Sequence, residues 1–92
     1  MAFADLSAEP APEYGLSVET TTGEDLYRIG LLYAEGVACE QDLVAAHKWF
    51  NLAAMKGSED AKICRQEMAE LLCQEEIKSA LQAARDWLRL AN

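Results

Sequence analysis

The sequence predicts an all-α fold, and three observations support this prediction. From Glu24 onward, apolar residues recur at spacings of three and four, the period of an amphipathic helix. Glycines and capping residues interrupt the pattern three times, which divides it into four segments. No stretch of useful length alternates apolar and polar residues as a strand does. A chain of 92 residues forms one domain at most.

The first helix is predicted to begin at about Glu24 and to end at Gly36. Its N-cap is either Thr22 with Asp25 three positions on, or Thr21 with Glu24. Both pairs fit a capping box, so the sequence leaves this choice open. The side that faces the core is expected to carry residues spaced by three and four: Leu26, Ile29, Gly30 and Tyr33.

The second helix is predicted between an N-cap at Asp42 and a left-handed C-terminal residue at Gly57. Its predicted apolar stripe is Leu43, Ala46, Phe50, Ala53 and Ala54, widened by Trp49 and Met55. Alanines along such a stripe let two antiparallel helices approach closely, and the aromatic rings fill the space where the helices diverge.

Two more helices are predicted over 59–72, capped by Ser58, and over 75–90, after a break near Cys73. The third helix is expected to bury Ala61, Cys64, Met68, Leu71 and Leu72. The fourth is expected to bury Ile77, Ala80, Leu81, Ala84, Trp87 and Leu88, with Lys78, Gln82, Arg85 and Arg89 facing out. Paired carboxylates at 59–60 and 75–76 fall in first turns, where they favour the positive end of the helix dipole.

The stretch IGLLYAEG is followed by D-x-x-x-A-x-x-W-F-x-x-A-A-x-x-G. This spacing resembles the Sel-1-like repeat family, a tetratricopeptide-like helical repeat. The positions that carry the resemblance are Ile29, Gly30, Tyr33, Gly36, Asp42, Ala46, Trp49, Phe50, Ala53, Ala54 and Gly57. The family usually has a second glycine and then a valine in the inter-helix loop, where this chain has Ala38 and Cys39, so the loop is expected to turn differently.

The composition predicts an acidic disordered leader (1–23). The resemblance implies an antiparallel helical hairpin (24–57) and two C-terminal capping helices (58–92), in an α-α superhelix arrangement. The run KWFNLAA is similar to the bacterial version of the repeat, and the cluster at 84–87 to the last helix of small bacterial single-repeat proteins. Repeats of this type need neighbours to bury a continuous core. The C-terminal helices are therefore expected to act as the missing neighbour, or the chain pairs with another copy.

The charge distribution limits the classes of partner. The net charge is −8, and six of the 16 acidic residues lie in the first 25 positions, which hold no Lys or Arg. A nucleic-acid partner requires clustered basic residues, and none are present. No apolar run reaches the length of a membrane helix, and no secretory signal precedes the helices, so a cytoplasmic location is expected.

Catalysis and metal binding are not expected from the polar residues. Zinc would require Cys39, Cys64, Cys73 and His47 to converge from four segments. A Cys39–His47 nucleophile pair is conceivable, but nothing supplies an oxyanion hole. We therefore expect no enzyme activity, no cofactor and no metal, with the cysteines as buried reduced thiols and His47 as a partly exposed helix residue.

The candidate binding residues are Tyr27, Arg28, Leu31, Glu35 and Trp87. Tyr27 and Leu31 are expected to form an exposed apolar pair opposite the buried stripe of the first helix, flanked by charge, a combination that suits a peptide or helix partner. The alternative is that Leu31 covers the C-terminal helices. Trp87 is either a binding anchor or a core residue, whereas Trp49 is expected in the core.

These residues predict a non-catalytic protein–protein interaction module, a bacterial adaptor or regulatory protein that docks a partner peptide or helix. One alternative is a homo-oligomeric structural unit, a homodimer for example, in which the lone repeat stacks on a second copy. A third hypothesis is a thiol-based redox or metal sensor that uses the three cysteines.

Overall fold

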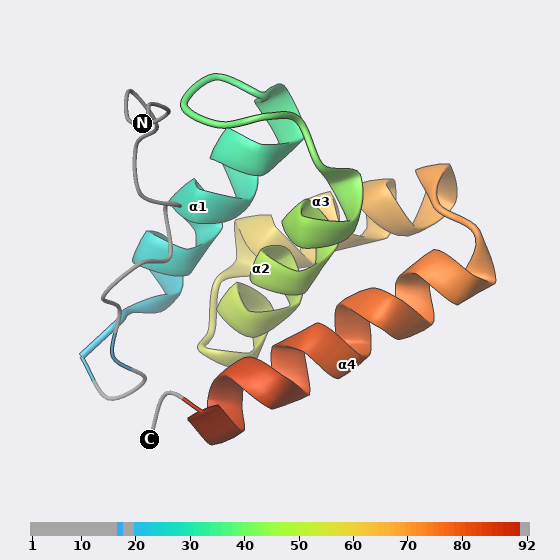
Figure 1. Ribbon diagram of the computed structural model, residues 1–92. Coiled ribbons are helices and arrows are strands. Elements are labelled where there is room, and N and C mark those ends of the chain that lie inside the picture. Colours follow the sequence, from blue (N-terminus) through green and yellow to red (C-terminus); the bar gives the residue numbers. More distant parts are fainter. Residues whose placement is uncertain (1–16, 18–19, 91–92) are drawn as a thin grey trace, which may run out of the picture.

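The computed structural model describes residue 17 and residues 20–90, without the side chain of the last of these. Within this part the chain is all-helical, with α1 (Gly23–Glu35), α2 (Leu43–Met55), α3 (Glu59–Leu71) and α4 (Gln74–Leu90). Helix α2 lies between α1 on one side and α3 and α4 on the other (Figure 1). The all-α prediction is confirmed, whereas the predicted leader lies almost wholly outside the described residues.

The N-terminus of α1 resolves the choice between two capping pairs. Thr22 Oγ1 accepts the Asp25 N–H at 3.1 Å, and the Asp25 carboxylate accepts the Thr22 N–H at 3.1 Å. This reciprocal pair is a capping box, so Thr22 is the N-cap. The backbone hydrogen bond from Thr22 is the main reason that the pKa of Asp25 lies below its usual value.

The loop between α1 and α2 turns at a single glycine. Gly36 has φ +70°, and of the described residues only Gly36 and Gly57 have positive φ. Ala38 therefore needs no left-handed backbone and causes no strain in this loop. The Gln41 side chain donates to the Ala34 carbonyl at 2.9 Å and ties the loop back to α1.

The remaining boundaries follow from local capping. Asp42 and Ser58 cap α2 and α3 as predicted, and Gly57 between them has φ +99°. The fourth helix begins one residue earlier than predicted. The reason is that the Glu76 carboxylate accepts the Cys73 N–H at 2.9 Å and supplies half of a capping box.

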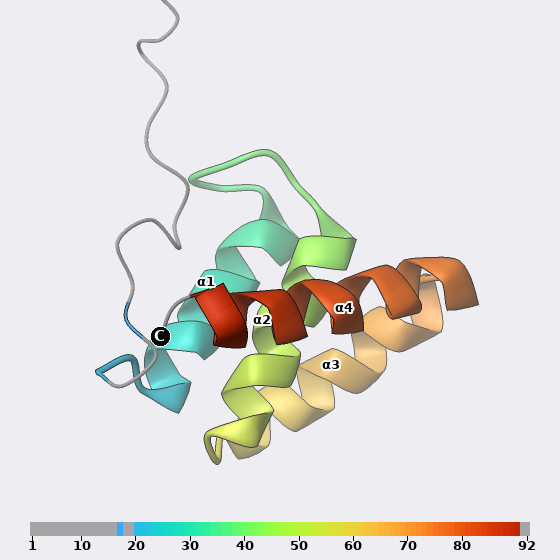
Figure 2. The same ribbon diagram turned by 60° about the horizontal axis from the view of Figure 1, so that its bottom comes forward.

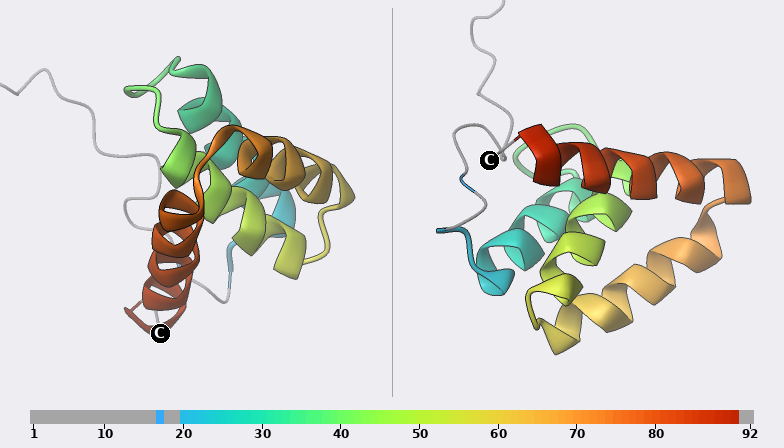
Figure 3. Two further views of the ribbon diagram at one scale, coloured as in Figure 1. Left: turned by 90° about the vertical axis from the view of Figure 1, so that its right-hand side faces the viewer. Right: turned by 90° about the horizontal axis from the view of Figure 1, so that it is seen from below.

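Helix α2 is the centre of the fold. The last two helices meet at residues 72–73 and diverge, and α2 occupies the opening between them (Figure 2, Figure 3). Helices α1, α3 and α4 all pack on α2. Seven of its 13 residues are consequently buried: Ala46, His47, Trp49, Phe50, Leu52, Ala53 and Ala54.

Small residues allow the other helices to approach α2 closely. A Cβ placed on Gly30 of α1 would lie 2.5 Å from Cε1 of Phe50, closer than side chains tolerate. On the opposite side, α3 contributes Ala61 to the core and α4 contributes Ala80 and Ala84. Within the described residues, no helix is both long and apolar enough to cross a membrane.

Several burial predictions are wrong. Met55 and Leu71 are 62% and 66% exposed, because each is the last residue of its helix and lies beyond the neighbouring helices. His47 is only 3% exposed, because α3 and α4 both pack against its side of α2. Among the cysteines, which were expected to be buried, Cys73 is exposed and the other two are half-buried.

Candidate protein-interaction surface

The candidate surface on α1, called here the Tyr27–Leu31 face, consists of Tyr27, Arg28, Leu31 and Glu35. The structure places all four on one helix, as expected. The apolar pair is half-buried and packed against the core, rather than fully exposed as predicted. The Tyr27 ring lies 6.0 Å from the Phe50 ring at an interplanar angle of 43°. The core-facing side of α1 is therefore wider than the predicted stripe.

Tyr27 also lies near Cys64 of α3, and both side chains pack against the core. Burial is the main cause that raises the pKa of Tyr27 above its usual value, and Cys64 adds to the shift. Tyr27 is thus a neutral phenol at physiological pH, held between two helices. Its orientation is fixed before any partner binds, which reduces the entropy cost of binding.

The two charged members of the face remain accessible. The Arg28 side chain is 66% exposed and lies 3.6 Å from the Glu24 carboxylate and 3.8 Å from the Asp25 carboxylate. Glu35, at the last turn of α1, is exposed. Exposed ion pairs of this kind contribute little to stability, so a partner can exchange them at low cost.

Trp87 is not part of this face. Its ring meets Trp49 edge-on, with centroids 5.3 Å apart and an interplanar angle of 75°. Trp49 is buried, which confirms its predicted place in the core. Trp49 and Phe50 are consecutive on α2 and point about 100° apart. Trp87 therefore packs on a different side of α2 from Tyr27.

The positions that carry the family resemblance all have packing, capping or turn roles. Ile29, Gly30, Ala46, Trp49, Phe50, Ala53 and Ala54 are buried, and Tyr33 is half-buried against the core. Gly36 and Gly57 adopt positive φ, and Asp42 caps α2. None of these positions forms a projecting binding surface.

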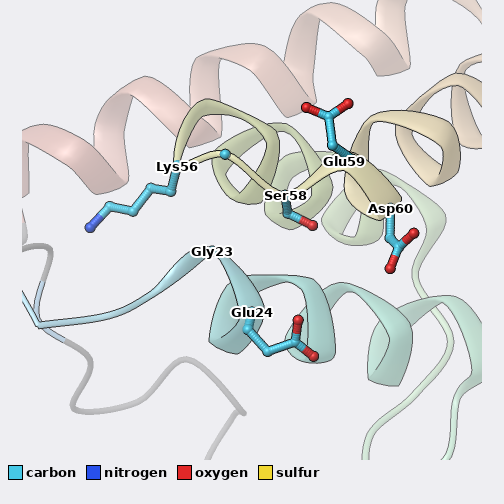
Figure 4. Close-up of a pocket in the computed structure, with 7 residues that line it drawn as sticks. Gly23, Glu24, Lys56, Ser58, Glu59 and Asp60 are labelled. Atoms are coloured by element: carbon cyan, nitrogen blue, oxygen red, sulfur yellow. The ribbon is translucent and has the colours of Figure 1, made fainter.

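A depression of about 280 Å³ lies where the N-terminal ends of α1 and α3 meet. Figure 4 shows Asp60 pointing from α3 toward α1, whereas Glu59 points away. Glu24 pairs with Arg28, and Glu59 pairs with Lys62 at 3.2 Å. These carboxylates sit in first turns, where the helix dipole already stabilises them, so their presence does not indicate a ligand.

A second depression, of about 210 Å³, lies over α2, α3 and α4 and contains residues that the sequence did not single out. Its polar members are His47, Asn51, Arg65 and Gln66. Arg65 donates to the Asn51 side-chain oxygen at 2.7 Å. One feature of the sequence could have indicated this cluster. His47 and Asn51 are four residues apart, which puts both on one face of a helix.

The nucleophile and metal hypotheses gain no support from the geometry. His47 Nδ1 has no hydrogen-bond partner among the described residues. Burial is the main cause that raises the pKa of the Cys64 thiol, which disfavours the reactive thiolate. Within residues 17 and 20–90, no three His, Cys, Asp or Glu side chains are placed to hold a metal ion together.

No protein-family model matches the chain, and no curated protein or solved structure matches it either. The likeness to Sel-1-like repeats therefore rests on residue spacing in the sequence. The arguments for function rest on the surfaces described above.

Proposed function

We propose that this chain is a non-catalytic protein–protein interaction module, a cytoplasmic bacterial adaptor or regulatory protein. It docks a partner peptide or helix on the Tyr27–Leu31 face of a Sel-1-like hairpin. The C-terminal helices α3 and α4 close the hairpin in place of a second repeat. The spacing of the buried residues on α1 and α2 supports the family assignment.

The observation that carries the proposal is the composition of the Tyr27–Leu31 face. Tyr27 and Leu31 are held against the core yet keep part of their surface accessible. Arg28 and Glu35 stand beside them in solvent. A fixed aromatic ring and an aliphatic side chain flanked by opposite charges are typical of the centre and rim of a binding site. Charge then sets the orientation of the partner.

The test uses charge reversal, because truncation of Tyr27 would also remove core contacts. Tagged wild type, Arg28→Glu and Lys78→Glu are used to capture partners from the native lysate, with identification by mass spectrometry. Lys78 is the matched control: it is 73% exposed and forms one ion pair, 3.7 Å from Glu75 on α4. We expect one reproducible partner that wild type and Lys78→Glu retain and Arg28→Glu loses.

Both variants should keep the wild-type melting curve, because surface substitutions of this kind change stability by about 0.5 kcal/mol or less. A partner that binds all three chains equally would place the docking site elsewhere. Absence of any partner that depends on Arg28 would count against the adaptor role.

A second candidate is homo-oligomerisation, which exposed apolar residues on α3 favour. Ile63 and Leu71 are 61% and 66% exposed and lie two turns apart, with Glu67 and Glu70 between them. If a second copy covers this surface, Ile63→Lys should convert a dimer to a monomer. A solution mass that stays monomeric at all concentrations would dismiss this candidate.

A further inference from the structure

The depression over α2, α3 and α4 combines a polar floor with an apolar rim. His47 and Asn51 come from α2, Arg65 and Gln66 from α3, and the aliphatic members are Ala69 of α3 with Ile77 and Leu81 of α4. Ile77 and Leu81 are half-buried, so each presents accessible apolar surface. None of these residues belongs to the Tyr27–Leu31 face.

One residue that lines the depression, His47, has a buried polar atom without a hydrogen-bond partner among the described residues. The His47 side chain is almost fully buried, and its Nδ1 makes no hydrogen bond with the described residues. Such atoms are rare in folded proteins because a lost hydrogen bond in the interior is costly. Packing alone would favour an aliphatic residue here, so the imidazole indicates a polar requirement at this place.

The floor also contains a positive charge without a counter-ion. Arg65 is half-buried, and no carboxylate of the described residues lies within 4.0 Å of its guanidinium. Its hydrogen bond goes to the neutral amide of Asn51. In a chain with 16 acidic residues and a net charge of −8, this half-buried arginine lies beside a histidine and an amide rather than a carboxylate. Four of the five guanidinium N–H groups remain for another acceptor.

The size of the depression limits what can bind. Cavities of about 150 Å³ accommodate benzene, whereas drug-sized ligands occupy about 300 Å³ or more. The depression of about 210 Å³ is open to solvent, so it can hold a single amino-acid residue while the rest of a longer chain stays outside. The arrangement requires a carboxylate at the Arg65 end and a short aliphatic group against Ile77 and Leu81.

We propose that the depression over His47, Asn51 and Arg65 binds the C-terminal residue of a partner polypeptide, with its carboxylate on Arg65 and an aliphatic side chain against Ile77 and Leu81. A C-terminal residue carries both groups on one Cα, whereas an internal acidic residue would need a second residue for the apolar contact. The planar guanidinium matches a carboxylate with two parallel hydrogen bonds. The depression is a second docking site, independent of the Tyr27–Leu31 face.

The test is a titration of the full isotope-labelled chain, followed by NMR shifts of its backbone amides. The probe is a six-residue peptide of glycine and serine that ends in leucine, with a free carboxylate or as the C-terminal amide. We expect the acid to shift amides near residues 47–51, 65–69 and 77–81. The amide form should bind at least about tenfold weaker, since it lacks the charge.

Two variants locate the carboxylate, and one serves as control. Arg65→Gln should weaken binding of the acid about tenfold or more. Asn51→Asp supplies an internal carboxylate next to Arg65, so it should block the peptide while it preserves the fold. Arg85→Gln removes an exposed arginine of α4 that likewise has no carboxylate within 4.0 Å, and should bind as wild type does.

Several outcomes would overturn the proposal. Equal binding of the acid and the amide would show that the carboxylate does not contribute to binding. Absence of NMR shifts up to about 10 mM peptide would show that the depression does not bind the peptide. If free isovalerate binds as tightly as the peptide, a small carboxylic acid is the ligand and the polypeptide assignment is wrong. Arg28→Glu should leave the titration unchanged, so this result and the lysate capture succeed or fail separately.

Discussion

The two sides of α2 are built differently. Toward α1 the contact is close and apolar, with Gly30 against the Phe50 ring and Tyr27 tilted on the same ring. Toward α3 and α4 the contact contains an edge-on tryptophan pair, but also a buried histidine with an unpaired nitrogen and an arginine without a counter-ion. The apolar residues on the side toward α1 are explained by their contribution to stability. The second side keeps polar groups that stability alone does not explain, and such departures are expected at functional or strained sites.

The largest expected effect comes from removing the second side. A chain of residues 1–57 lacks α3 and α4, so the α3- and α4-facing side of α2 is exposed to water. Helices α1 and α2 have 13 residues each, and isolated helices of about 12–15 residues are marginal in water. We expect no cooperative thermal transition by far-UV circular dichroism. The full chain under the same conditions is the control, and a cooperative melt of 1–57 would show that the hairpin folds alone.

A smaller effect is expected from filling the close contact on the first side. Gly30→Ala gains about 1 kcal/mol of helix propensity but forces its Cβ into the buried Phe50 ring, which costs about 1–3 kcal/mol. We expect a net loss of about 1 kcal/mol of unfolding free energy in urea. In a Phe50→Leu background the same change should become neutral or stabilising, because the ring is gone. Equal costs in both backgrounds would mean that the contact does not set the helix distance.

The smallest expected effect is the pH dependence of stability that His47 causes on the side of α2 toward α3 and α4. Burial lowers the pKa of His47 below its usual 6.5, and the neighbouring Arg65 charge lowers it further. As the pH falls below about 6.5, the unfolded chain therefore takes up a proton before the folded chain does, and stability decreases. Wild type should therefore lose more unfolding free energy than His47→Leu between about pH 7.5 and 5.5. Identical pH profiles would show that His47 titrates normally in the fold.

The helices themselves were predictable because their signals are local. Thr22, Gly36, Asp42, Gly57 and Ser58 act within a few residues of their own position, so capping rules place each boundary to within about two residues. The all-α class followed from periodicity for the same reason.

The sequence did not predict correctly which residues are buried, because burial depends on how many helices pack against each helix. A periodic stripe assumes that each helix has one buried side, which suits α1 but not a helix with three neighbours. His47 was therefore expected to be partly exposed, and its closeness to Arg65 was not foreseen. Met55 and Leu71 fit the apolar stripes of α2 and α3, yet they are exposed because they lie beyond the neighbouring helices.

The candidate site was foreseen in part. Tyr27, Arg28, Leu31 and Glu35 share one helix because they are close in sequence. Their burial depended on α3, which reaches Tyr27 through Cys64. The separation of Trp87 from this face depended on the path of α4, and no local signal encodes that path.

The central claim is that the Tyr27–Leu31 face contacts another protein, and site-specific photo-crosslinking in cells tests it most directly. A photoreactive amino acid replaces Arg28 in one chain and Lys78 in another; the two positions are 66% and 73% exposed. We predict that position 28 yields one adduct with a different polypeptide and that position 78 yields none. Adducts only with a second copy of the chain, or the same adducts from both positions, would contradict the claim.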